Sequence, residues 1–267
     1  MRKNSWWALL YNFIFIMFIM APLLIVVAVS FTDKGYISLP TNGLSLRWFY
    51  AIFEANEIIA SFWLSLKLGL VSATVAILLA IPAALAIARY QFRGRGAVMA
   101  FFLSPLMIPH VVLGVAFLRF FNVVGISGSF IWLAATHVII VMPYALRLVL
   151  SSATGMSQDA EQAAMSLGAS RFTTLRRITI PLMLSGVVGG WLLAFIQSFD
   201  ELTMTIFVAT PGTTTLPVAM YNHITHTIDP LVTSVSTVLI IGTLALMLLL
   251  DRVVGLDKVL IGKNSNR

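Results

Sequence analysis

Residues 6–31 read WWALLYNFIFIMFIMAPLLIVVAVSF, a stretch of 26 residues that contains no charged side chain. A helix needs about 20 apolar residues to cross a hydrocarbon core of roughly 30 Å. The apolar part of a cleaved secretory signal is only about 7–15 residues long. The stretch therefore predicts an uncleaved membrane span that begins just after Arg2 and Lys3.

The composition of the whole chain agrees with this start. The 267 residues are 59% hydrophobic and only 10% charged, whereas soluble domains are roughly 45–50% apolar and about 25% charged. So little charge cannot cover a water-exposed surface, which excludes a soluble enzyme. The chain has no cysteine, which excludes disulfides, thiolate metal sites and cysteine nucleophiles.

Five more apolar stretches follow the first, at residues 68–88, 97–118, 130–146, 182–199 and 231–250. Helices satisfy their own backbone hydrogen bonds in lipid and open strands do not. The sequence therefore predicts an all-α polytopic membrane protein with six transmembrane helices in a single domain, residues 1–267. Pro105 and Pro109 predict a bend in the third span, because proline removes a helical hydrogen bond.

Lysines and arginines set the expected orientation. Thirteen of the 17 lie on the same side as the two termini, and only Lys34, Arg47, Lys67 and Arg119 lie on the other. Positive residues accumulate in the cytoplasm, so both termini are predicted to be cytoplasmic. The net charge of +7 then reflects membrane topology, and no nucleic-acid partner is expected.

Small residues recur at four-residue intervals in two spans, as Ser72, Ala76, Ala80, Ala84 and Ala88, and as Gly186, Gly190 and Ala194. Such rows allow helix backbones to approach closely. They predict tight helix packing, within one bundle or across a dimer, in preference to a ligand site.

Motifs for catalysis are missing from the chain. There is no GxxxxGK[ST] phosphate-binding loop, no GxSxG and no HExxH, and the pair His223 and His226 lacks a third ligand. We therefore expect no catalytic residue, no metal and no cofactor in this chain. His110 is the one ionisable residue that we single out inside the spans. It is either a pathway residue or a hydrogen-bonded packing residue.

The loop between the fourth and fifth spans, residues 157–181, is the most specific part of the sequence. It reads SQDAEQAAMSLGASRFTTLRRITIP. Ser157 can cap a short helix whose apolar face includes Ala163, Ala164 and Leu167, and Gly168 predicts the turn that ends it. From these properties alone, the loop could simply lie on the inner leaflet, held there by its arginines.

The spacing of this loop resembles the EAA motif of bacterial ABC-importer permeases, which is E-A-A, three residues, G, nine residues, I or V, x, L, P. Gln162-Ala163-Ala164, Gly168, Ile178 and Pro181 fall on this spacing, with Gln162 in place of Glu and Ile180 in place of Leu. SFDELTMTIFV at 198–208 and TTTLPVAMY at 213–221 are similar to the second permease subunits of spermidine/putrescine importers.

The resemblance implies a MetI-like helical bundle in the bacterial inner membrane. Such a subunit forms half of the pathway for a small polar solute, here a polyamine or related cation. The implied partners are a second permease subunit, usually a different chain, an ATPase dimer that binds ATP and Mg²⁺, and a periplasmic substrate-binding protein. The implied contacts with the ATPase are Glu161, Gln162, Ala163, Ala164, Leu167, Gly168 and Phe172.

Asp200 and Glu201 are predicted at the outer end of the fifth span. Two adjacent carboxylates attract positive charge, so together with His110 they are candidates for the substrate pathway. The pair could equally be a solvated helix end or a docking contact for the binding protein.

Two other classes of protein remain as alternatives. A stand-alone secondary transporter or channel would need inverted repeats and ionisable residues near the midplane. A membrane-embedded enzyme would need a cluster of His, Asp or Ser at one depth. Co-purification with an ATPase separates an importer subunit from both.

Overall fold

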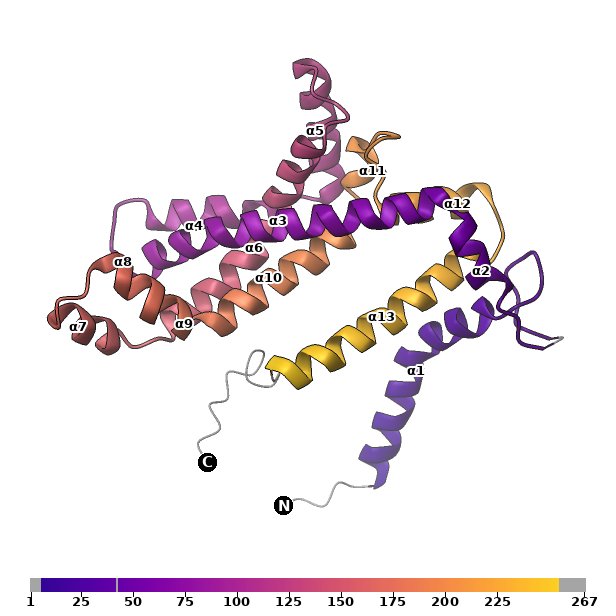
Figure 1. The fold of residues 1–267 in the computed structure, drawn as a ribbon, viewed down its shortest axis with the longest axis horizontal. Coiled ribbons are helices and arrows are strands. Elements are labelled where there is room, and N and C mark those ends of the chain that lie inside the picture. The colour runs from indigo at the N-terminus through magenta and orange to yellow at the C-terminus, as the bar shows by residue number, and fades with distance from the viewer. Residues whose placement is uncertain (1–5, 42, 255–267) are drawn as a thin grey trace. The chain divides into compact units, whose positions relative to one another are not determined.

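The computed structural model describes residues 6–41 and 43–254, and these residues form helices and loops without any strand. The predicted all-α class is confirmed (Figure 1). The chain divides into two compact units, one built from residues 1–60 and 220–248 and the other chiefly from residues 61–219. The terminal cations used to predict orientation, such as Arg2 and Lys263, lie outside the described residues.

The first unit contains α1 (Trp6–Ser30), α2 (Arg47–Glu54) and most of α13 (Leu231–Val254). Its polar contacts gather where α1 ends. The Ser234 hydroxyl donates to the Ser30 carbonyl at 3.3 Å, and the Trp48 indole donates to the Lys34 carbonyl at 3.0 Å. Most of α1 exposes apolar side chains, as expected of a helix whose solvent is lipid.

The second unit is organised around α3 (Asn56–Arg89), α6 (Phe130–Thr154) and α10 (Leu184–Phe199). The small residues of α3 form its packing surface: Ser72, Ala76, Ala80 and Ala84 are fully buried. The Ser72 hydroxyl donates to the Ala134 carbonyl of α6 at 3.4 Å. The predicted close packing along this row is therefore confirmed.

The glycines of α10 let it approach α6. A Cβ atom on Gly186 would lie 2.4 Å from Ser152 Cβ, and one on Gly190 would lie 3.2 Å from the Ala145 carbonyl oxygen. The close packing predicted from the spacing of these glycines thus occurs within one chain, between α10 and α6.

Two of the predicted spans are bent pairs of helices. The first joins α4 (Arg95–Leu103) and the 3-10 turn η1 (Ser104–Leu106) to α5 (His110–Val124) at 95°. This confirms the bend predicted from Pro105 and Pro109, and Figure 1 shows α5 turning away from α4.

The second bend, of 70°, was not predicted from the sequence. It separates α8 (Arg171–Thr174), η2 (Leu175–Thr179) and α9 (Ile180–Leu182) from α10. The segment η2 is a π-helix and is followed by Pro181, and both features are common causes of helix kinks.

The six predicted stretches all fall on a helix or a bent pair. Among the described residues, α1, α3 and α6 are long and apolar enough to cross a membrane, and counting each bent pair as one span raises the total to five. The sixth stretch lies in α13, whose described apolar part is Leu231–Ala245.

Candidate functional site

The 157–181 loop folds as a short helix, a glycine turn and a second helix. The helix α7 (Asp159–Ser166) begins after Gln158, which occupies the cap position predicted for Ser157. The Ser157 hydroxyl, one residue earlier, accepts a hydrogen bond from the Asp159 N–H at 3.1 Å. Gly168 has φ +90°, and the Ala169 N–H donates to the Ala164 carbonyl at 3.0 Å. This geometry is a Schellman-type helix end, which favours glycine. The turn predicted at Gly168 is confirmed.

One face of this loop is left uncovered by residues 6–41 and 43–254. Gln162 and Ala163 are exposed, and Leu167 and Phe172 expose 89% and 71% of their surface. Large apolar side chains that stand out on a polar loop are typical of a surface that contacts another protein or a membrane. We call Gln162, Ala163, Leu167, Gly168 and Phe172 the coupling face.

Glu161 points the other way. It is only 4% exposed, and Arg89 at the end of α3 holds its carboxylate through the two terminal guanidinium nitrogens, with Nη2 2.6 Å from Oε1. The Thr179 hydroxyl donates to the same carboxylate. Glu161 is therefore grouped by sequence with the coupling face but is turned into the chain, while Ala164 is half-buried.

Burial alone would raise the pKa of the Glu161 carboxyl. Hydrogen bonds from Arg89 and Thr179, together with the charge of Arg89, outweigh that effect and hold its pKa below the ordinary value. Glu161 is thus charged at neutral pH. The sequence marked Arg89 only as an orienting charge, and no local pattern identifies it as the partner of Glu161.

The three candidate pathway residues lie close together, and two of them pair. His110 Nδ1 lies 2.8 Å from Glu201 Oε2, and Glu201 Oε1 accepts a hydrogen bond from the Met204 N–H at 2.6 Å. Glu201 is 7% exposed, whereas Asp200 is exposed. The structure therefore leaves one open carboxylate at this position, and the other links α5 to the turn before α11 (Thr205–Val208).

His137 was missed by the sequence analysis. It lies fully buried in α6, with Nδ1 2.9 Å from the Ser198 hydroxyl and Nε2 3.1 Å from the Thr205 hydroxyl. The expectation that His110 is the one notable ionisable residue in the spans is therefore wrong. The sequence could have indicated His137, because an ionisable side chain inside an apolar span is unusual. With both ring nitrogens bonded, His137 joins α6, α10 and α11.

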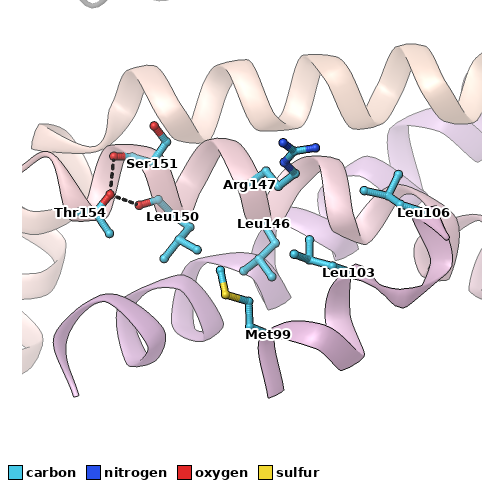
Figure 2. A pocket seen from close by; sticks show the side chains of 8 residues that line it. All are labelled: Met99, Leu103, Leu106, Leu146, Arg147, Leu150, Ser151 and Thr154. Atoms are coloured by element: carbon cyan, nitrogen blue, oxygen red, sulfur yellow. Dashed lines mark hydrogen bonds between the residues drawn. The ribbon is translucent and has the colours of Figure 1, made fainter. Parts of the chain in front are cut away.

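An open cavity of about 450 Å³ lies between α4 and α6 (Figure 2). Its walls are Met99, Leu103, Leu106, Leu146, Arg147, Leu150, Ser151 and Thr154. The Thr154 hydroxyl bonds back to its own helix, at 3.0 Å from the Leu150 and Ser151 carbonyls. A cavity lined by one arginine and no carboxylate does not favour a cationic solute. It therefore gives no support to a solute pathway beyond the candidates His110, Asp200 and Glu201.

A metal site finds no support in the described residues, where no group of three or more His, Asp or Glu side chains could hold an ion. His223 pairs instead with Asp229, at 2.9 Å between Nε2 and Oδ1.

Comparison with known families identifies the fold's relatives. A profile of the family described as "binding-protein-dependent transport system inner membrane component" matches residues 76–256, more than half of the chain. The chain belongs to this family. It is therefore an ABC-importer permease of the MetI-like type, as the resemblance of the 157–181 loop implied.

Relatives that align with most of the permease are named as permease proteins of transport systems. It is 33% identical over 247 residues to the spermidine/putrescine transport system permease protein PotC of Haemophilus influenzae, covering 92% of this chain and 94% of that protein. It is 30% identical to the putrescine transport system permease protein PotI of Escherichia coli, covering 86% and 84%. A putative 2-aminoethylphosphonate transport system permease protein of Salmonella paratyphi A is 29% identical, covering 90% and 91%.

Solved structures show the same fold at low sequence identity. A bacterial ABC transporter involved in the import of the acidic polysaccharide alginate matches with a TM-score of 0.72 at 12% identity, covering 95% of the permease and all of that chain. The same kind of transporter bound to an alginate-loaded periplasmic protein matches with a TM-score of 0.68 at 15% identity. The likeness concerns the fold alone.

Proposed function

We propose that this permease forms half of the pathway through which an importer moves a polyamine or related small cation, driven by a separate ATPase. In this proposal both termini lie in the cytoplasm. A periplasmic binding protein delivers the solute from the opposite side, and a second permease subunit completes the pathway. ATP and Mg²⁺ are bound by the ATPase subunits.

The coupling face carries the proposal. Leu167 and Phe172 are more exposed than apolar side chains of their size usually are, and they lie on the loop with the EAA spacing. Alanine and glycine beside them permit a close approach by a partner surface. A coupling helix changes the permease only if the partner binds its two states with different affinity, so close, specific docking is required.

The solute class is supported by the relatives and by one carboxylate. Relatives with polyamine names cover most of the chain at about 30% identity. Asp200 is exposed beside Glu201, which is buried and paired with the half-buried His110, and an open carboxylate favours a cation.

The experiment is co-purification followed by reconstitution. The permease is expressed with its neighbouring transport subunits, tested for a bound ATPase, and assayed in liposomes for ATP-dependent uptake of radiolabelled spermidine. Competition by unlabelled putrescine and 2-aminoethylphosphonate ranks the solutes. Spermidine uptake that needs no ATPase would support a stand-alone carrier, and strong competition by 2-aminoethylphosphonate alone would replace the solute class.

Gly168→Arg tests the coupling face directly. The space beside Gly168 is open, so an arginine meets no clash within the chain, although φ +90° strains any side chain. We expect membrane insertion to persist while ATPase binding and uptake are lost. The control is Gly96→Arg, where the space is also open and the backbone is helical. Normal ATP-driven uptake in Gly168→Arg would contradict the assignment of this face.

A further inference from the structure

Glu161 differs from the rest of α7 in being buried. The remaining residues of that helix are exposed or half-buried, and both oxygens of the Glu161 carboxylate are occupied. Oε2 bonds to Arg89, and Oε1 bonds to Arg89 and to Thr179. A buried carboxylate with all these partners has a fixed position, unlike an exposed ion pair.

Arg89 connects this carboxylate to the core of the second unit. It is the last residue of α3, whose Ala80, Ala84 and Ile87 belong to the buried core. Its Nε atom is buried without a hydrogen-bond partner, so the two terminal nitrogens and Glu161 hold the guanidinium. A planar fork bound at two points fixes orientation as well as distance.

Thr179 connects the same carboxylate to the other bent span. It ends the π-helix η2 and directly precedes α9, which leads into α10. One side chain of α7 therefore holds two transmembrane segments, α3 and the α9–α10 span. We call Arg89, Glu161 and Thr179 the anchor cluster.

We infer that the anchor cluster is the rigid link that passes a displacement of α7 to α3 and α10, with Glu161 and Arg89 acting as positioning residues for the coupling face. An isolated helix of eight residues is too short to be stable, so α7 needs a tertiary tie to transmit motion. The cluster supplies that tie through the buried Glu161, while Leu167 stays exposed. The inference rests on the proposed function, because it requires a partner that moves α7.

Pulsed EPR distances in the assembled importer test the link. The chain has no natural cysteine, so nitroxide labels attach only to the two cysteines that are introduced. These are Gln91→Cys, after α3, and Ser166→Cys, in α7, and the partner subunits are made cysteine-free. Both positions are exposed. Distances are measured in lipid nanodiscs with and without ATP and vanadate. The ATP hydrolysed per spermidine imported is measured in liposomes.

The variants are Arg89→Gln and Glu161→Gln, with Arg93→Gln and Asp159→Asn as controls. Each control loses the same charge from the same short segment, but at an exposed position. We expect a single narrow distance, unchanged by nucleotide, in the parent and both controls. Arg89→Gln and Glu161→Gln should broaden the distance and raise ATP consumption per solute by about 5- to 10-fold, a typical coupling magnitude.

Arg89→Gln behaving like Arg93→Gln in both measurements would overturn the inference. If Arg89→Gln does not reach the membrane, Glu161→Gln compared with Asp159→Asn decides, because it removes the charge of the same ion pair and keeps Arg89. Broadening in that variant supports the link, and the parental distance overturns it. A parent complex that binds no ATPase refutes the proposed function instead, so the two failures are distinguishable.

Discussion

Replacing Gly186 or Gly189 of α10 by alanine should have opposite effects on the stability of the permease. A Cβ atom at Gly186 would lie 2.4 Å from Ser152 Cβ and 2.8 Å from the Leu148 carbonyl oxygen, which belongs to backbone and cannot rotate away. At Gly189 the nearest atom is the end of the Leu148 side chain, at 3.8 Å. Alanine is therefore an overpacking substitution at the first position and an ordinary contact at the second.

The magnitudes follow from this geometry. Replacing glycine by alanine in a helix gains up to about 1 kcal/mol, and overpacking costs about 1–3 kcal/mol. Gly186→Ala should lose about 1–2 kcal/mol of unfolding free energy, and Gly189→Ala should gain about 0.5–1 kcal/mol. At about 2–4 °C per kcal/mol, the two Tm values should differ by roughly 3–12 °C.

The assay is thermal unfolding of the detergent-solubilised permease, followed by size-exclusion chromatography of a fluorescent fusion. Both variants carry the same added methyl group, so effects on expression or detergent binding cancel in the comparison. A Tm for Gly186→Ala equal to or above that of Gly189→Ala would refute the view that α10 packs on α6 through its glycines.

Three further outcomes are expected. His137→Leu leaves the Ser198 and Thr205 hydroxyls buried without their partner, so thermal unfolding should show a loss of about 1–3 kcal/mol. Asp200→Asn removes the open carboxylate, so liposome assays should show a KM for spermidine raised about tenfold with Tm unchanged. The lowered pKa of Glu161 means that its contribution to stability is complete above the unfolded-state pKa and is lost as pH falls through the folded-state pKa. The Tm should therefore decrease as the pH is lowered past about 4. The decrease should be less steep in Glu161→Gln than in the parent.

Each of these has a matched comparison. His226→Leu changes an exposed histidine and should leave Tm unaltered, and an equal loss in both histidine variants would argue against the buried network. Glu57→Gln removes another exposed carboxylate and should not affect KM, so equal effects there would indicate general surface charge. An identical acid profile in Glu161→Gln and the parent would show that other carboxylates set the acid limit.

Several features of the fold were predictable because they depend on neighbours along the chain. Hydropathy run lengths identified the apolar stretches, Pro105 and Pro109 indicated a bend, found to be 95°, and Gly168 indicated the turn that ends its helix. Each of these signals comes from a few consecutive residues. The 70° bend before α10 was not predicted, although Pro181 lies just before it; the π-helix that precedes Pro181 has no signal of this kind.

The sequence by itself determined that this chain is a helical membrane protein, which loop carries the EAA spacing and which spans can pack closely. Only the tertiary structure decided what its few polar side chains do. Glu161 bonds to a residue 72 positions away, Glu201 to one 91 positions away, and His137 to one 61 positions away. The physical reason is that burying a charge or an imidazole requires a partner, and that partner is chosen by which helices pack together in three dimensions.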